Sequence, residues 1–339
     1  MVGRFVISLD FELLWGMRDR ATRESYGRNI LGERDAIPAL LDLFERSSIR
    51  ATWATVGMLL CESKDEILAR VPGEQPRYAN PALSAYSYLD EVGTDERSDP
   101  HYFGASIARH ILSCPGQELA THTFSHYYCL EPGQTEDQFA ADIDAALKVL
   151  NGFHQRCVSI TFPRNQYSGH HLNICHRAGL RVFRGNETNP NYAPLDRRQA
   201  FDIRRRGYRL MDAYYDLSGQ NVSKPEINPG RLVDVPSSRF LRPWDTRLRF
   251  FDGSRLARIR NAMTAAATSE AVFHLWWHPH NFGVNLVENI ALLREILEHF
   301  RKLHSEYGMM SSAMAEWAPA LALCFCARVI GFQPFWPIF

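Results

Sequence analysis

The stretch Phe5-Val6-Ile7-Ser8-Leu9-Asp10-Phe11-Glu12 opens the chain with an apolar run that ends in two acids. The run from Phe5 to Leu9 is typical of a buried first strand. Asp10 and Glu12 alternate with apolar residues, so both carboxylates are expected on one face at the end of this strand. Two carboxylates on one face suit one metal ligand and one general base. A helix cap or a solvated strand edge is the alternative interpretation.

The rest of the chain alternates short apolar runs with amphipathic helical patterns. A strand followed by a helix implies parallel strands joined by crossover helices. No glycine-rich phosphate loop follows the first strand, which disfavours a dinucleotide-binding fold and leaves an α/β barrel or a doubly wound sheet. Strands are predicted at 51–56, 118–121, 158–162, 180–183 and 271–276, and helices at 34–46, 135–150, 170–178, 255–267 and 286–304.

The composition is that of a globular protein. The chain has 339 residues, of which 45% are hydrophobic and 22% charged, so a disordered or collagen-like chain is excluded. With 38 basic and 38 acidic residues the formal net charge is zero, which argues against a nucleic-acid binder. We expect a single domain over residues 1–317, interrupted by irregular insertions near 62–100 and 186–251.

The neutral total hides a basic segment. Between residues 195 and 260, 14 Arg and one Lys face eight acids, a local net charge of +7. This excess suggests that the substrate carries an anionic handle, such as the diphosphate of a nucleotide-linked or lipid-linked sugar. The alternative is that these arginines pair with the interspersed acids and with acids elsewhere in the chain.

The two ends of the chain bear on its location. The N-terminal apolar run is too short for a signal-peptide core, so a cytoplasmic protein is expected. Residues 318–339 form an apolar tail interrupted by Pro319, Pro334 and Pro337, and its unbroken part is too short to span a bilayer. We expect this tail to pack against the domain or to contact the inner face of the membrane peripherally.

Three further sites place polar residues at predicted strand ends, where βα folds build their active sites. His122 and His126 can reach one cation if the backbone turns helically after His122, although two structural histidines are equally consistent with the spacing. Arg164 follows a strand and can hold a carboxylate in its charged form, or it is one of many surface arginines. The segment 276–280, Trp-Trp-His-Pro-His, offers rings that desolvate a histidine or stack on a sugar.

Together these motifs resemble those of the polysaccharide deacetylase family, the NodB-homology carbohydrate esterases of family 4. The segment 50–57, Arg-Ala-Thr-Trp-Ala-Thr-Val-Gly, is close to the family's second strand, and 122–126 matches its His-[Ser/Thr]-x-x-His motif. The acidic cluster 8–12 and the late segment 277–279 resemble its first and last motifs, and 163–165 resembles its arginine motif loosely. The matches keep the family's order over residues 5 to 283.

The resemblance implies a distorted (β/α)7 barrel of the NodB-homology type and metal-dependent removal of an N-acetyl group from a sugar. By position, it implies that His122 and His126 bind the metal and that Asp10 is the general base. It further implies that Arg164 orients Asp10 and that His278 is the general acid. Zn²⁺ is the expected metal, with Co²⁺, Ni²⁺ and Mn²⁺ as alternatives, and no organic cofactor is expected.

The sequence departs from the family pattern at its acidic motif. The usual adjacent acids are Asp10 and Phe11 here, so Glu12, two residues beyond Asp10, is the expected acidic metal ligand. His280 is an alternative to His278 as the acid. The expected substrate is an N-acylated amino sugar, a cytoplasmic nucleotide- or lipid-linked precursor. Hydrolysis of a non-sugar amide, as by allantoinase-like relatives, and a non-catalytic carbohydrate-binding role stay open as alternatives.

Overall fold

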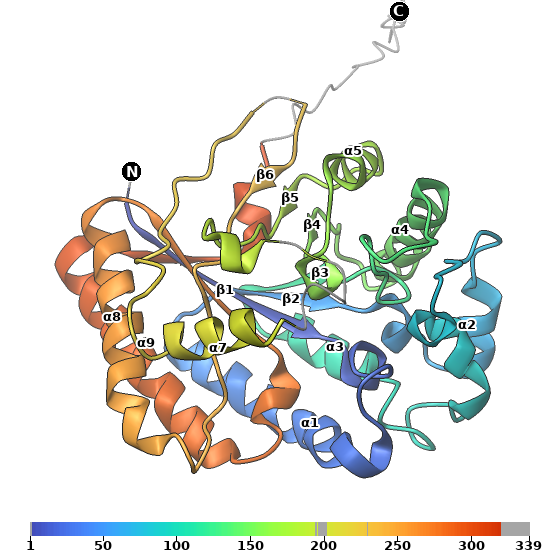
Figure 1. Cartoon of the computed structure of the whole chain (residues 1–339), viewed down its shortest axis with the longest axis horizontal. Coiled ribbons are helices and arrows are strands. Elements are labelled where there is room, and N and C mark those ends of the chain that lie inside the picture. Colours follow the sequence, from blue (N-terminus) through green and yellow to red (C-terminus); the bar gives the residue numbers. More distant parts are fainter. Residues whose placement is uncertain (1, 194, 196–201, 229, 320–339) are drawn as a thin grey trace, which may run out of the picture.

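A computed structural model of the chain describes residues 2–193, 195, 202–228 and 230–319 (Figure 1). The predicted packing or membrane contact of the apolar tail falls almost entirely on residues 320–339, outside the described residues. In the described part of the chain, no helix is both long and apolar enough to cross a bilayer.

The centre of the molecule is one sheet whose strand pairings are all parallel. Its order is β6-β5-β4-β3-β2-β1-β8-β7, and β9 pairs with the start of β1. Because β6 and β7 stand at the two ends of this order, the curled sheet is open at the seam between them. The strands described are β1 (Arg4–Phe11), β2 (Ala51–Thr55), β3 (Gln117–Thr121), β4 (Ser159–Ile160), β5 (Val182–Phe183), β6 (Val233–Asp234), β7 (Arg239–Phe240), β8 (Val272–Trp277) and β9 (Met310–Ser312).

Helices connect the strands and cover the outside of the sheet (Figure 1). The predicted α/β architecture of parallel strands and crossover helices is confirmed, and the predicted insertion near 186–251 contributes α7, β6 and β7. The α-helices described are α1 (Arg23–Arg46), α2 (Lys64–Arg70), α3 (Ala105–Ser113), α4 (Glu136–Asn151), α5 (Gly169–Arg177), α7 (Ile203–Asp212), α8 (Asp252–Thr268) and α9 (Leu286–Tyr307).

β1 is the middle of the structure for a reason visible in its sequence. It lies between β2 and β8, and its residues from Phe5 to Phe11 are all buried. A parallel strand covered on both faces is expected to be almost continuously apolar, as this one is. The polar exceptions, Ser8 and Asp10, are therefore buried deep in the molecule and need polar partners.

Candidate active site

Polar side chains at the carboxyl ends of three strands, β1, β3 and β8, meet at one edge of the sheet. β1 pairs with β2 and β8, and β2 pairs with β3, so the carboxyl ends of these strands lie side by side. Asp10 and Glu12 come from the end of β1, His122 from the end of β3 and His278 from the end of β8. The structure thus brings together six residues that the sequence predicted from distant segments, because His126 and His280 lie in the same cluster.

Glu12 is the centre of this cluster. Its Oε2 lies 3.0 Å from Nε2 of His126 and 3.4 Å from Nε2 of His122. Its Oε1 lies 3.3 Å from Nε2 of His280 and 3.7 Å from Nε2 of His278. Glu12 is 3% exposed, so imidazole nitrogens rather than water surround both of its carboxylate oxygens.

His122 and His126 do not lie on a helical turn, which corrects the geometry expected from their spacing. The chain instead turns through left-handed residues, Thr123 with φ 65° and His126 with φ 55°. Asp142 of α4 stabilises this loop by accepting hydrogen bonds from the backbone N–H groups of Phe124 and Ser125. The loop still places the two imidazole rings 5.0 Å apart, so both face Glu12.

His278 and His280 differ in what they can reach. His280 is 2% exposed, and its Nδ1 lies 2.9 Å from the hydroxyl of Tyr26, so its Nε2 is directed at Glu12. His278 keeps 24% of its side chain exposed, lines the pocket in front of Asp10, and lies 3.8 Å from Oδ2 of that residue. Of these two histidines, His278 is the one placed to contact a substrate.

Asp10 is held by an arginine, but by Arg184 rather than by Arg164. Arg184 donates from Nη1 to Oδ1 of Asp10 over 2.7 Å and from Nη2 to Oδ2 over 2.8 Å. The same guanidinium also donates to Ser8 Oγ and to Asn165 Oδ1, and it lies 4.2 Å above the ring of Trp276. This bidentate pair satisfies two buried charges at once.

Arg164 faces another acid. It forms an ion pair with Asp19, and its guanidinium lies 3.9 Å from the centre of the Tyr128 ring. Arg164 and Asn165 both have positive φ, so the loop after β4 turns Arg164 away from Asp10 while Asn165 contacts Arg184. The predicted contact between Arg164 and Asp10 is therefore corrected by the structure.

The position of Arg184 in the sequence did point to a functional role. It follows directly after β5 (Val182–Phe183), a strand that was predicted, and strand ends are where βα folds place functional side chains. A bare Arg after an apolar run, in a chain with many arginines, has no motif around it to mark it. Only the folded structure shows that Arg184 reaches β1, through its hydrogen bonds to Ser8 and Asp10.

The electrostatics keep both carboxylates ionised. Burial would raise the pKa of Asp10, but the charges of Arg184 and His122 and the hydrogen bonds from Arg184 outweigh it, so the pKa is lowered. Burial is likewise outweighed at Glu12, where His278 and His126 hold the pKa well below its usual range. Burial also lowers the pKa of His278, which makes its protonated ring a stronger acid.

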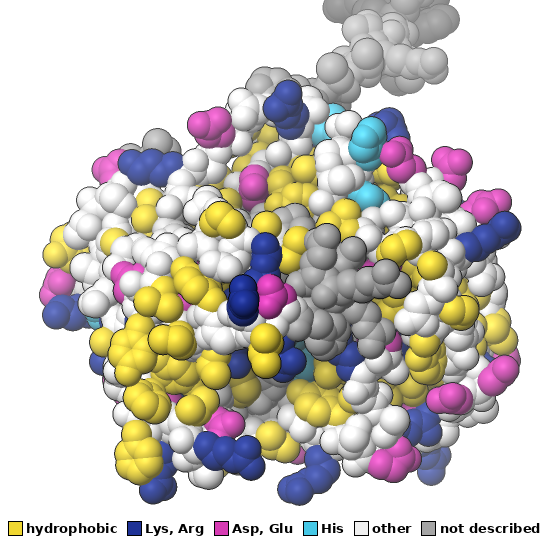
Figure 2. Space-filling view, in the orientation of Figure 1, with side chains coloured by type: hydrophobic (Ala, Val, Ile, Leu, Met, Phe, Trp, Pro, Cys, Tyr) yellow, Lys and Arg dark blue, Asp and Glu magenta, His cyan; other side chains and the backbone are white. Residues whose placement is uncertain are grey.

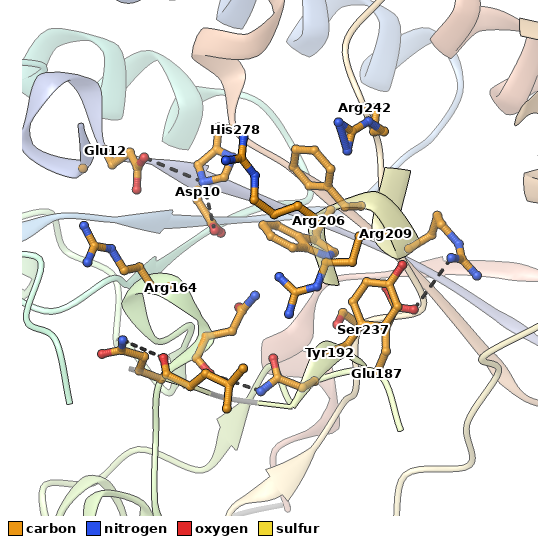
Figure 3. A pocket seen from close by; sticks show the side chains of 18 of the residues that line it. Asp10, Glu12, Arg164, Glu187, Tyr192, Arg206, Arg209, Ser237, Arg242 and His278 are labelled. Atoms are coloured by element: carbon orange, nitrogen blue, oxygen red, sulfur yellow. Dashed lines mark hydrogen bonds and ion pairs between the residues drawn. The ribbon is translucent and has the colours of Figure 1, made fainter. Parts of the chain in front are cut away.

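A pocket of about 450 Å³ opens in front of Asp10, Glu12 and His278 (Figure 3). This volume is within the roughly 300–1,000 Å³ of small-molecule sites. Trp276 and Phe240, whose ring centres are 4.8 Å apart, form an aromatic part of its wall. More than half of the residues that line the pocket belong to the insertion 186–251.

The residues fit a divalent cation. One nitrogen each from His122 and His126 and one Glu12 oxygen lie within 4.8 Å of one another, and two His with one Glu are a known ligand set for catalytic Zn²⁺. Nδ1 of His122 contacts the Thr161 carbonyl at 2.8 Å, which leaves Nε2 for the ion. Glu12, His278 and His280 form a second set of the same kind.

Comparison with models of known protein families and with curated protein sequences finds no match. Solved structures do match. A protein from Mycobacterium smegmatis assigned as a polysaccharide deacetylase is 12% identical with a TM-score of 0.58, over 92% of this chain and 87% of that one. Another, from Pseudomonas aeruginosa PAO1, is 12% identical with a TM-score of 0.55, over 92% and 88%.

An allantoinase has the same degree of similarity, 12% identity and a TM-score of 0.53 over 92% of this chain and 88% of its own. The chain therefore has the fold of these proteins, and the resemblance read from the sequence holds at the level of fold. Because one fold hosts deacetylases and an allantoinase, the chemistry has to be argued from the site itself.

Proposed function

We propose that the protein is a metal-dependent hydrolase that removes an N-acyl group, in the simplest case N-acetyl, from an amino sugar. One observation carries the proposal. Glu12, His122 and His126 form a cation-binding set beside the ionised Asp10, and His278 faces the same pocket. A metal ligand set, a base and an acid around one cavity are the groups that amide hydrolysis requires.

Each group has a position suited to its role. When bound, a divalent cation would lower the pKa of an attacking water and polarise the acyl oxygen. Asp10 is the base, because its carboxylate is ionised and fixed by Arg184. His278 is the acid that protonates the leaving nitrogen, because it faces the pocket near Asp10, whereas His280 is buried behind Glu12. The aromatic wall of Trp276 and Phe240 offers a face for a sugar ring.

The proposal includes the finer expectations from the sequence: Zn²⁺ as the metal, and a cytoplasmic precursor sugar as the substrate. The ligand set of two His and one Glu supports Zn²⁺. Screening N-acetyl sugars, free and nucleotide-linked, against allantoin in the presence of Zn²⁺, Co²⁺, Ni²⁺ or Mn²⁺ separates the sugar from the non-sugar reaction. Protein that binds none of these metals and releases no amine would point to a non-catalytic binder.

The base is tested by Asp10→Asn. We expect release of acetate to fall by about 10²–10⁴-fold, the usual contribution of general acid–base catalysis. Metal content, measured by mass spectrometry of the folded protein, should stay at the wild-type level because Asp10 is outside the ligand set. Asp42→Asn, an exposed carboxylate on α1, is the matched control and should retain full activity.

Asp10→Asn also leaves Arg184 without its partner, so circular dichroism must confirm that the variant is folded. His278→Gln gives an independent reading, since it removes the acid and keeps both buried charges paired. Wild-type rates in both variants would refute the assigned roles.

A further inference from the structure

The wall of the pocket has an excess of positive charge. Six arginines line it, against three acids. Of the acids, Asp10 is paired with Arg184, which is not one of the six, so Asp10 does not cancel their charge. Glu12 lies among the histidines of the candidate metal site. The lining arginines are Arg20, Arg164, Arg206, Arg209, Arg239 and Arg242, and the acids are Asp10, Glu12 and Glu187.

Part of the basic segment 195–260 is structural. Asp212 at the end of α7 is fully buried and accepts hydrogen bonds from Arg239 over 2.6 Å and from Arg258 over 2.8 Å. Arg255 pairs with Asp252, and Arg260 with Glu295. The alternative interpretation from the sequence was that the arginines of this segment pair with acids. It therefore holds for four of them: Arg239, Arg255, Arg258 and Arg260.

Three arginines of the pocket wall are not engaged in this way. Among the described residues, no carboxylate lies within ion-pair distance of Arg206, Arg209 or Arg242. Arg209 donates through Nε to the carbonyl of Asn191, which leaves its two terminal nitrogens available to a ligand. We call Arg206, Arg209 and Arg242 the basic wall.

The fold directs the basic wall at the active site. Arg206 and Arg209 are three residues apart on α7, so they project from one side of the helix. Arg242 follows β7, at the opposite side of the open seam from β6. Figure 3 shows all three around the space in front of Asp10 and His278. Charge that no described carboxylate neutralises, gathered beside a cavity, is a binding feature for an anion.

We propose that the basic wall binds a phosphoryl or diphosphoryl group of the substrate. The inference rests on the proposed function in one respect: the sugar would lie between this wall and Glu12, with its acyl group at the metal ligands. A planar guanidinium group can donate two parallel hydrogen bonds to two oxygens of one phosphate. A neutral polysaccharide has no such anionic group. The substrate is then a sugar phosphate ester rather than a neutral polymer.

The binding test uses metal-free protein, prepared with a chelator, and inorganic pyrophosphate as the probe. Isothermal titration compares wild type with the double variant Arg206→Ala/Arg242→Ala. We expect the dissociation constant to rise at least tenfold in the variant, and wild-type binding to weaken as salt is raised. The matched control is Arg204→Ala/Arg247→Ala, which removes two exposed charges from the same segment but none from the pocket. Its affinity should change less than twofold.

Absence of pyrophosphate binding by wild type, or equal weakening in both double variants, would overturn the proposal. Because no metal and no turnover are involved, this result is separate from the proposed function, which fails only if no N-acyl substrate is hydrolysed. Two further arms distinguish the carrier: a nucleoside diphosphate sugar and a short-chain polyprenyl diphosphate sugar. If the shared diphosphate is recognised, Arg206→Ala/Arg242→Ala must weaken the binding of both compounds. The compound that the wild type binds more tightly identifies the carrier.

Discussion

At the scale of single residues, the position of the Glu12 carboxylate depends on a missing side chain. A Cβ on Gly16 would lie 2.0 Å from Cδ of Glu12 and 2.2 and 2.3 Å from its two oxygens. These separations are far inside van der Waals contact, so Gly16 is the residue that makes room for the proposed metal ligand. Glu12 is flexible enough to move away, but only by leaving its contacts with His122 and His126.

Gly16→Ala is therefore expected to keep the fold and to lose metal. We expect the affinity for Zn²⁺, measured by competition with a chromogenic chelator, to fall at least tenfold, because ligand positions off by a fraction of an ångström weaken a metal site. Gly169→Ala, where no atom lies within 4 Å of the added carbon, is the control and should bind as the wild type does. Unchanged affinity in Gly16→Ala would show that Glu12 is not a ligand.

The residues of the site that sequence reasoning found are those with a motif around them. Asp10 and Glu12 end an apolar strand, and His122, His126 and His278 follow others, so strand-end placement predicted their meeting. Arg184 was missed and Arg164 was put in its place, because both follow strands and only the folded chain shows that Arg184 pairs with Asp10 and Arg164 with Asp19. Arg164 and Asn165 both have positive φ, which turns Arg164 away from Asp10. Residue type alone does not predict this backbone conformation.

At the scale of elements, α4 supports the proposed metal ligands from outside the site. Asp142, fully buried on this helix, accepts hydrogen bonds from the backbone N–H groups of Phe124 and Ser125 in the loop between His122 and His126. Burial raises the pKa of Asp142 to about 6 even though these hydrogen bonds favour its charged form. The helix itself starts at a capping box of Thr135 and Gln138, so its position is fixed from its first turn.

Asp142→Ala should lower both stability and metal affinity. Leaving buried N–H groups unpaired costs about 1–3 kcal/mol, and the loop is then free to move His126 away from Glu12. Denaturant unfolding and metal titration of the same protein measure the two effects. Asp144→Ala on the exposed face of α4 removes only a surface ion pair with Lys148 and should cost less than about 1 kcal/mol. If Asp142→Ala loses stability but binds metal normally, the loop does not depend on α4 for its geometry.

Which elements the sequence revealed depends on their length and pattern. α4, α5, α8 and α9 were all predicted close to their observed bounds. α7 was missed because its sequence, Ile-Arg-Arg-Arg-Gly-Tyr-Arg-Leu-Met-Asp, has four arginines, a glycine and few buried positions. β6 and β7 have two residues each, as β4 and β5 do, but they lie within the segment 186–251, which the sequence marked only as an irregular insertion.

At the scale of the whole molecule, metal binding and folding should be linked. The ligands come from strands separated by more than a hundred residues, so the site exists only in the folded chain. Zn²⁺ at 100 times its dissociation constant would then stabilise the native state by about 2.7 kcal/mol. We expect the melting temperature to rise on adding Zn²⁺ to the wild type and to stay constant for Glu12→Gln. An equal rise in both proteins would place the ion elsewhere on the chain.

The surface of the molecule around α7 has a mixed character: hydrophobic side chains gather there, with basic side chains around them (Figure 2). Ile203 and Phe250 are 81% and 82% exposed. The segment that carries them also supplies the basic wall. The other residues of the site lie at or just after the ends of strands of the sheet: Asp10, Glu12, His122, Arg184 and His278.

This separation has a consequence for how such a chain can diversify. Mutations in the insertion 186–251 reach more than half of the pocket lining without altering any residue of the cation-binding set. Selection can therefore change which molecule is accepted while the reaction stays the same. For the engineer, the open seam between β6 and β7 marks the place where a foreign segment would be grafted to give this pocket a new specificity.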